Sequence, residues 1–104
     1  MKIQFNTNNH IEGREDLAEQ AEATVESTLG HLADHITRVE VHLSDENSAK
    51  GGAHDKRCMM EVRLEGHQPI AVTDDAETID QAIAGAADKL KRLLDHTLAR
   101  LNAR

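Results

Sequence analysis

Hydrophobic and polar residues alternate along four short stretches of the chain, which is the pattern of a β-strand with one buried and one exposed face. These stretches are residues 2–6, 36–44, 56–65 and 70–73. In the second stretch the alternation directs Thr37, Val39, Val41 and Leu43 toward the core. Pro69 directly precedes the fourth stretch. Because proline has no backbone N–H to donate, it favours an edge strand there.

Apolar residues recur every three or four positions in two longer stretches, which predicts two amphipathic helices. The first covers residues 13–32, with an apolar stripe of Leu17, Ala21, Val25, Leu29 and Leu32. The second covers residues 79–101, with a stripe of Ile79, Ile83, Ala86, Leu90, Leu94, Thr97 and Leu101. Thr78 and Gln81 form a capping box at the start of the second helix.

The element order is therefore β-α-β-β-β-α, and residues 45–55 form a polar loop between the second and third strands. Each strand has one apolar face, which two amphipathic helices can cover from one side. We predict an α+β fold in which a four-stranded mixed sheet carries both helices on one face. At 104 residues the chain is long enough for one domain, residues 1–104.

Composition narrows the possible functions. Phe5 is the single aromatic residue, so base stacking on aromatic side chains is excluded as a binding mode. The single cysteine, Cys58, fits a reducing compartment, and the sequence indicates no signal peptide or membrane span, so we expect a cytoplasmic protein. Cys58 faces inward and is expected in the core. No nucleophile, base and oxyanion donor come together in the sequence, so we expect neither an enzyme nor a cofactor.

Charge is unevenly distributed along the chain. The formal net charge of −7 arises within residues 1–55, whereas residues 56–104 carry equal numbers of cationic and acidic side chains. At about 100° per residue, Lys89, Arg92, His96 and Arg100 fall on one flank of the second helix. Such a row is typical of a solvated helix surface with (i, i+4) pairs, here Asp88–Arg92 and Lys91–Asp95. It also suits contact with an anionic partner, and the pattern alone leaves both interpretations open.

Three stretches resemble the short ribosome hibernation-promoting factors, the ribosome-associated inhibitor family also called sigma-factor modulation or ribosomal subunit interface proteins. They are "IEGREDL" (residues 11–17), "GHLADHITRVEVHLS" (residues 30–44) and "TIDQAIAGAADKLKRLL" (residues 78–94). In the third, Asp-Lys-Leu-x-Arg-x-Leu is typical of the family's second helix. The resemblance runs from Ile3 to Leu101 and implies the same β-α-β-β-β-α fold. Long members carry a further C-terminal dimerisation domain, which this chain is expected to lack.

The resemblance also implies a function. Family members bind the small ribosomal subunit in the channel used by messenger and transfer RNA, and they block translation during starvation or stationary phase. Lys89 and Arg92 match the helical motif, and His96 and Arg100 hold later positions where the family often has cations. Arg57 and Arg63 of the third strand are additional candidates for contact with ribosomal RNA. Four to six phosphate contacts would give a salt slope of roughly −3 to −5.

Two alternatives remain open. The first helix is rich in carboxylates, namely Glu12, Glu15, Asp16, Glu19, Glu22 and Glu26. A protein-interaction module of the same fold, with weak or no RNA binding, could use this acidic helix or an edge strand to bind a regulator or a second copy of itself. The acidic helix could also meet a basic ribosomal protein, and we expect a monomer or weak dimer. The second alternative is a metal site on His31 and His35, which stand at (i, i+4) near the end of that helix. The helix dipole also explains these histidines, and we expect no metal. Asp74 and Asp75 are expected in the turn before the second helix.

Overall fold

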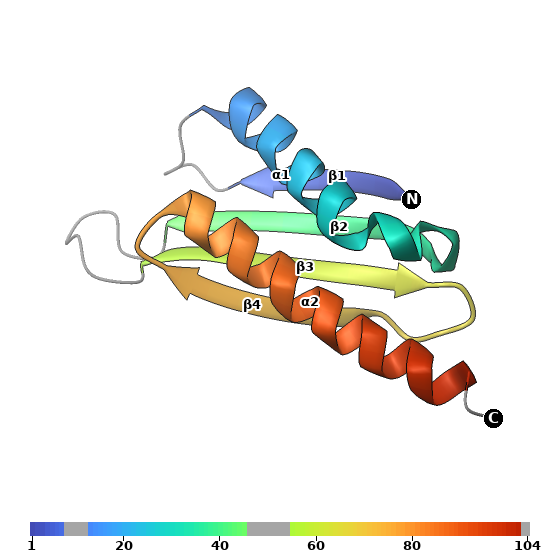
Figure 1. The fold of residues 1–104 in the computed structure, drawn as a ribbon. Coiled ribbons are helices and arrows are strands. Elements are labelled where there is room, and N and C mark those ends of the chain that lie inside the picture. The colour runs from blue at the N-terminus through green and yellow to red at the C-terminus, as the bar shows by residue number, and fades with distance from the viewer. Residues whose placement is uncertain (8–12, 46–54, 103–104) are drawn as a thin grey trace.

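The computed structural model describes residues 1–7, 13–45 and 55–102 of the chain. The element order is β1 (Lys2–Thr7), α1 (Arg14–Leu29), the 3₁₀ helix η1 (Gly30–His35), β2 (Ile36–Asp45), β3 (Lys56–Leu64), β4 (Ile70–Ala76) and α2 (Ile79–Asn102). The predicted β-α-β-β-β-α order is therefore confirmed (Figure 1). The predicted loop at 45–55 and the start of the stretch at 11–17 lie largely outside the described residues.

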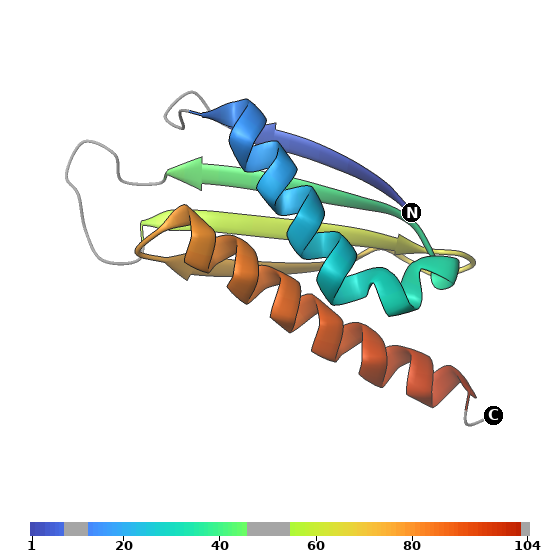
Figure 2. The same ribbon diagram turned by 45° about the horizontal axis from the view of Figure 1, so that its top comes forward.

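The four strands form one mixed sheet in the order β1-β2-β3-β4. β1 pairs with β2 in parallel, and the other two neighbouring pairs are antiparallel. Both helices lie on the same face of the sheet, α1 over the β1–β2 half and α2 over the β3–β4 half (Figure 2). The opposite face, called here the open face, carries none of the described helices. The predicted α+β architecture is confirmed.

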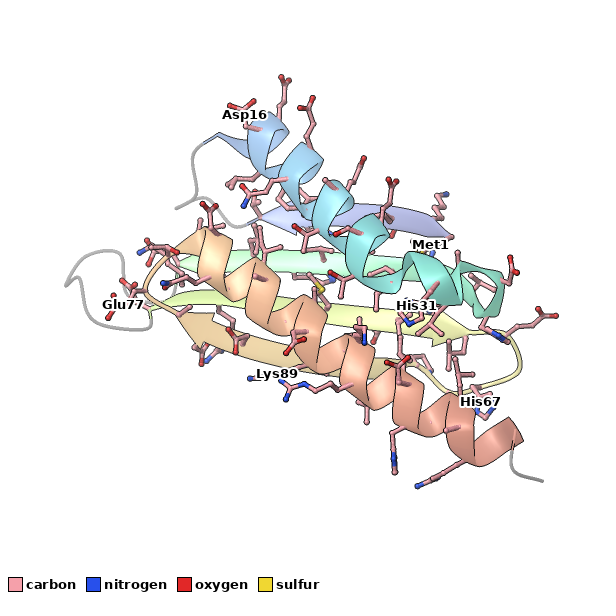
Figure 3. All side chains as sticks on the ribbon, in the orientation of Figure 1. Met1, Asp16, His31, His67, Glu77 and Lys89 are labelled. Atoms are coloured by element: carbon pink, nitrogen blue, oxygen red, sulfur yellow. The ribbon has the colours of Figure 1, made fainter. Side chains whose placement is uncertain are left out.

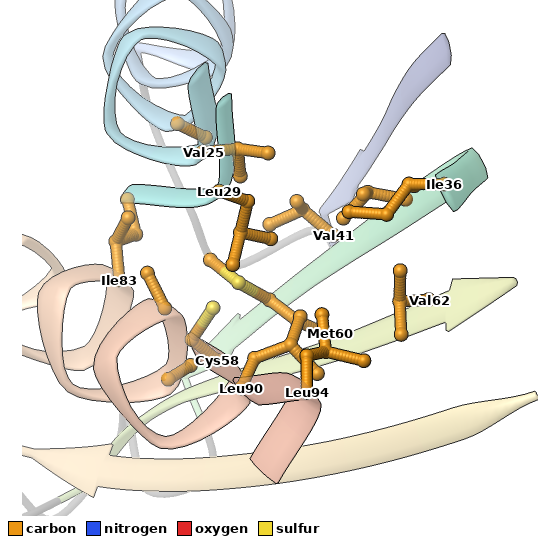
Figure 4. Packing of buried hydrophobic residues seen from close by; sticks show 14 of the residues in the cluster. Val25, Leu29, Ile36, Val41, Cys58, Met60, Val62, Ile83, Leu90 and Leu94 are labelled. Carbon is orange, nitrogen blue, oxygen red and sulfur yellow. The ribbon is translucent and has the colours of Figure 1, made fainter. Parts of the chain in front are cut away.

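The core lies between the sheet and the two helices, and aliphatic side chains fill it. Leu29 of α1 and Ile83, Leu90 and Leu94 of α2 are fully buried against Met60 and its neighbours in the strands (Figure 4). Full burial of one leucine side chain stabilises the fold by about 2 kcal/mol. Burial of this stripe fixes how α2 is rotated about its own axis. This rotation determines which flanks of α2 face solvent.

Local signals set the helix ends. The backbone N–H of Gln81 donates to Thr78 Oγ1 at 3.1 Å, so Thr78 caps α2, which is one half of the predicted capping box. The Gln81 side chain makes no return contact among the described residues. Gly13 precedes α1 in the left-handed region, with φ 73°, a conformation that glycine adopts without strain. α1 ends at Leu29 rather than at residue 32, and the chain continues as the tighter helix η1 from Gly30. Within the described residues no helix is both long enough and apolar enough to cross a lipid bilayer.

One predicted orientation is wrong. Thr37 is exposed, and Ile36 takes the buried position instead, with 4% of its surface exposed. The register of β2 against β3 shifts between Ile36, which pairs with Leu64, and Arg38, which pairs with Arg63. Such a bulge inserts an extra residue into one strand and reverses the alternation there. The Thr37 hydroxyl instead donates to the carbonyl oxygen of Arg63 at 3.1 Å.

The fourth strand is longer than predicted. β4 runs to Ala76, so Asp74 and Asp75 lie within the strand and not in a turn. Because successive side chains of a strand point to opposite faces, Asp74 points to the helix side and Asp75 to the open face. β4 is an edge strand and Pro69 immediately precedes it, as the sequence predicted. Each carboxylate pairs with a cation, Asp74 with Lys89 and Asp75 with Arg57. Both cations are candidates for contact with RNA.

Candidate nucleic-acid interface

The cationic flank of α2, formed by Lys89, Arg92, His96 and Arg100, faces away from α1. It faces solvent beyond the edge strand β4. Lys89 shows this directly, because its side chain reaches β4 on the side away from α1 (Figure 3). The other flank of α2 faces η1, where His31 Nε2 lies 3.2 Å from Asp95 Oδ1. The row of Lys89, Arg92, His96 and Arg100 therefore lies on the flank of α2 that faces away from α1 and η1. The sequence predicted that these four side chains share one flank.

Lys89 holds α2 against β4. Its Nζ atom lies 2.9 Å from Asp74 Oδ1 and donates to the carbonyl oxygen of Thr73 at 2.9 Å. The Asp74 side chain is only 20% exposed, so this ion pair is partly shielded from water. Lys89 is thus committed to a contact inside the protein, and an RNA phosphate would have to share it with Asp74. No pattern in the sequence predicts this contact, since the residues around Asp74 indicate a turn and not a strand.

The next three cations of the flank point into solvent. Arg92 Nη2 lies 2.8 Å from Asp88 Oδ2, and both side chains are more than half exposed. An exposed (i, i+4) pair of this kind contributes little to stability and can exchange partners at little cost. His96 and Arg100 are exposed and make no ion pair or hydrogen bond with any residue that the structure describes. The C-terminal half of the flank is therefore the part most open to an anion.

The two candidates of β3 lie on the open face and differ in their contacts. Arg57 meets Asp75 across the strand pair, with Nε 2.8 Å from Oδ1 and Nη2 3.3 Å from Oδ2. This two-point contact neutralises the guanidinium within the sheet surface. Arg63 is exposed and has no acidic partner within the described part of the chain. The structure therefore divides the six candidates between the flank of α2 and the open face of the sheet, and carboxylates hold Lys89, Arg92 and Arg57.

The acidic residues of α1 lie away from the cationic flank of α2. Asp16, at the start of α1, and Lys89 are on opposite sides of the molecule (Figure 3). The exposed carboxylates of α1 are those of Glu15, Asp16, Glu19, Glu22 and Glu26; Glu12 lies outside the described residues. Charges on opposite faces of a small domain are screened from each other over roughly 8 Å at physiological salt. The acidic net charge is therefore compatible with a locally cationic surface.

The two histidines that follow α1 are not arranged like metal ligands on one face of a helix. His31 and His35 both belong to the 3₁₀ helix η1. In a 3₁₀ helix the residues that align are three apart, so an (i, i+4) pair does not share one face. Within the described residues no three histidine, cysteine, aspartate or glutamate side chains gather as a potential metal site. His31 instead contacts Asp95, and this contact lowers the pKa of the Asp95 carboxyl, with a further contribution from Lys91.

Cys58 is a core residue, as the sequence predicted. It is fully buried between the sheet and α2, and this burial raises the pKa of its thiol to about 12, with an added contribution from the negative charge of Asp74. A thiol with such a pKa stays protonated at neutral pH and is a poor nucleophile.

Comparison with known proteins supports the fold and the family. The N-terminal domain of Protein Y from Thermus thermophilus superimposes with a TM-score of 0.74 at 18% identity, covering 93% of this chain and 99% of that one. A ribosomal subunit interface protein from Coxiella burnetii gives a TM-score of 0.73 at 19% identity, covering 95% and 99% of the two chains. At such identities the likeness shows the fold alone. No curated protein sequence matches this chain closely enough to count as a relative. The family model described as "Sigma 54 modulation protein / S30EA ribosomal protein" matches residues 6–102, and the chain belongs to this family.

Proposed function

We propose that this protein binds the small ribosomal subunit near the channel for messenger and transfer RNA and inhibits translation by occupying that channel. Family membership supports association with the ribosome, and the fold is that of a ribosomal subunit interface protein. Such a protein works in the cytoplasm, without catalytic turnover or cofactor. The observation that carries the proposal is the cationic flank of α2, which faces outward beyond the edge strand and away from the acidic helix.

The six candidate residues are proposed to contribute unequally to RNA binding. His96, Arg100 and Arg63 meet phosphates directly, because no described acidic residue holds them. Arg92 joins them at little cost, since its pair with Asp88 is exposed. Lys89 and Arg57 add positive potential while keeping their contacts with Asp74 and Asp75. This division predicts a salt slope at the lower end of the range expected for four to six contacts, about −3.

Co-sedimentation with purified small subunits at several salt concentrations tests the proposal. Arg92→Glu and Arg100→Glu are the informative variants, because Lys89 also holds α2 to β4 and its replacement would disturb the fold. Lys91→Glu is the matched control, since it makes the same charge change on the opposite flank of the same helix. The proposal expects binding that fades with salt, is lost in the two arginine variants and survives in the control. Equal effects of all three changes, or no binding by the wild type, would reject it.

A second candidate function is a protein-interaction module of the same fold. The observation in its favour is that carboxylates within the protein already hold Arg57, Lys89 and Arg92. In that case the exposed carboxylates of α1 would bind a basic protein, such as a ribosomal protein. The same sedimentation experiment separates the two functions. Binding to subunits that is insensitive to the α2 variants and abolished by Glu19→Lys and Glu22→Lys would favour the second.

A further inference from the structure

Three cations form a row across the open face of the sheet. In the register of the strands Lys2 of β1 pairs with Arg38 of β2, and Arg38 pairs with Arg63 of β3. Since neighbouring strands lie about 4.8 Å apart, the row is roughly 10 Å long. The three residues alternate with core residues and so point to the same, uncovered face. Only Arg63 was a candidate from the sequence. Lys2 and Arg38 were missed because their neighbourhood depends on strand register.

The row is poorly neutralised within the protein. Lys2 and Arg63 are exposed and make no ion pair with any residue in the described ranges. Arg38 makes one long contact, with Nη2 3.9 Å from Glu40 Oε2, and its buried Nε has no hydrogen-bond acceptor among the described residues. Like charges directly opposite each other in a sheet repel. An anion bound between them would remove this repulsion and offer acceptors to the guanidinium groups.

The surroundings of the row restrict the direction from which an anion can approach. The next paired positions along β2 and β3 are Glu40 and Glu61, which face each other and repel a phosphate. The free side of the row is the end of the sheet where β1 begins and β3 turns into β4 (Figure 1). Glu65 is the exposed carboxylate of that turn, next to the exposed His67. The C-terminal half of α2, with His96 and Arg100, extends toward this same end (Figures 1 and 2).

We propose that Lys2, Arg38 and Arg63 form a second phosphate-binding surface, which holds the sugar–phosphate backbone of the RNA that α2 also contacts. This inference rests on the proposed function, because it names a further contact for the same RNA. The RNA strand passes around the edge of β4, from the flank of α2 to the open face of the sheet. Arginine and lysine suit this task since they neutralise phosphates without reading sequence.

The test compares Lys2→Gln/Arg38→Gln with wild type and with Lys91→Gln, a cation outside both surfaces. Binding is measured against salt with two probes, purified small subunits and a short single-stranded RNA. Lys2 and Arg38 add two phosphate contacts to the four of the proposed function, so the wild-type salt slope is expected to be about −5 and that of the double variant about −3. Its affinity for small subunits should fall roughly 10- to 100-fold at physiological salt. Lys91→Gln should match the wild type.

The two proposals fail in different ways. If Arg100→Glu abolishes subunit binding while the double variant keeps the wild-type affinity and slope, the cationic row is not a contact and the proposed function stands. If the wild type does not bind the small subunit but binds RNA, and the salt slope is smaller for the double variant, the proposed function is rejected. RNA binding by the cationic row is then supported. Binding to neither probe rejects both. Should the double variant melt earlier than the wild type, Lys2→Gln alone, on the exposed edge strand, is expected to lower the slope by about one.

Discussion

Asp74 of β4 and Gly85 of α2 lie so close together that a β-carbon on Gly85 would overlap the Asp74 carboxylate. The absence of a side chain at residue 85 leaves room for this carboxylate between strand and helix. There it accepts the contact from Lys89, one helical turn further along α2. Gly85, Asp74 and Lys89 thus form one unit that fixes α2 on the edge strand. The position of the cationic flank depends on this unit.

The effect of Gly85→Ala on the free energy of unfolding should depend strongly on the Asp74 side chain. In an ordinary helix this change stabilises by about 1 kcal/mol, because alanine is the better helix former. Here the methyl group forces the Asp74 carboxylate away from Lys89, so we expect a neutral or destabilising change in the wild-type background. In an Asp74→Ala background the same change should stabilise by about 1 kcal/mol. Urea unfolding of the four proteins gives the coupling energy. Additive effects would show that the carboxylate moves aside freely.

Lys89→Met should lower the free energy of unfolding by about 1 kcal/mol, since it leaves the mostly buried Asp74 carboxylate without its cation. Arg92→Met, the control on the same flank, removes a pair whose side chains are 71% and 62% exposed. That change should stay within about 0.5 kcal/mol. Denaturant unfolding of both variants measures the difference. Equal effects would contradict a holding role for Lys89.

The thiol of Cys58 should be unreactive in the folded protein. It is fully buried, and its pKa is raised to about 12 by that burial and by the charge of Asp74. Reaction with a chromogenic disulfide reagent should therefore proceed only through opening of the structure, and it should become fast in concentrated urea. Because the chain contains a single cysteine, the signal has one source. Rapid labelling of the native protein at neutral pH would argue against this packing.

The fold was predictable because its signals are local. Alternation along β1 to β3 and the apolar stripe of α2 each specify an element from neighbouring residues alone. Two errors have physical reasons. The bulge that turns Thr37 outward depends on how β2 pairs with β3, which no periodicity encodes. Asp74 and Asp75 come shortly before a helix, where aspartates commonly serve as caps, so the sequence alone favours a turn there. Each is accommodated in β4 by a cation from another element, Lys89 or Arg57.

The candidate site was predictable only in part. Helical geometry placed the four cations of α2 on one flank, because their angles follow from spacing along one element. The contacts that decide which of them are available join residues far apart in the chain. Lys89 with Asp74 is one such contact, and Arg38 opposite Arg63 is another. Strand register and helix packing create these neighbours, so only the folded structure reveals them.

The contact between His31 and Asp95 should make the attachment of η1 to α2 depend on pH. The pKa of the Asp95 carboxyl is lowered, first by its hydrogen bond with His31 and then by the one with Lys91. A carboxyl whose pKa is lower in the folded protein contributes stability that is fully present above its unfolded value, about pH 3.9. This contribution is lost as the pH falls through the folded value. Both side chains are over 40% exposed, so the contribution stays within about 1 kcal/mol.

Asp95→Asn should therefore be less stable than the wild type at pH 6, and the difference should shrink below about pH 4 as the wild-type carboxylate is protonated. His31→Ala should remove more of this pH-dependent difference than Lys91→Met, since the histidine contact lowers the Asp95 pKa most. Thermal unfolding of the four proteins between pH 2.5 and pH 6 measures these differences, in a range chosen to span the ordinary carboxyl pKa values. A wild-type advantage over Asp95→Asn that stays constant down to the lowest pH would mean that the Asp95 carboxyl is not held in its charged form by these contacts.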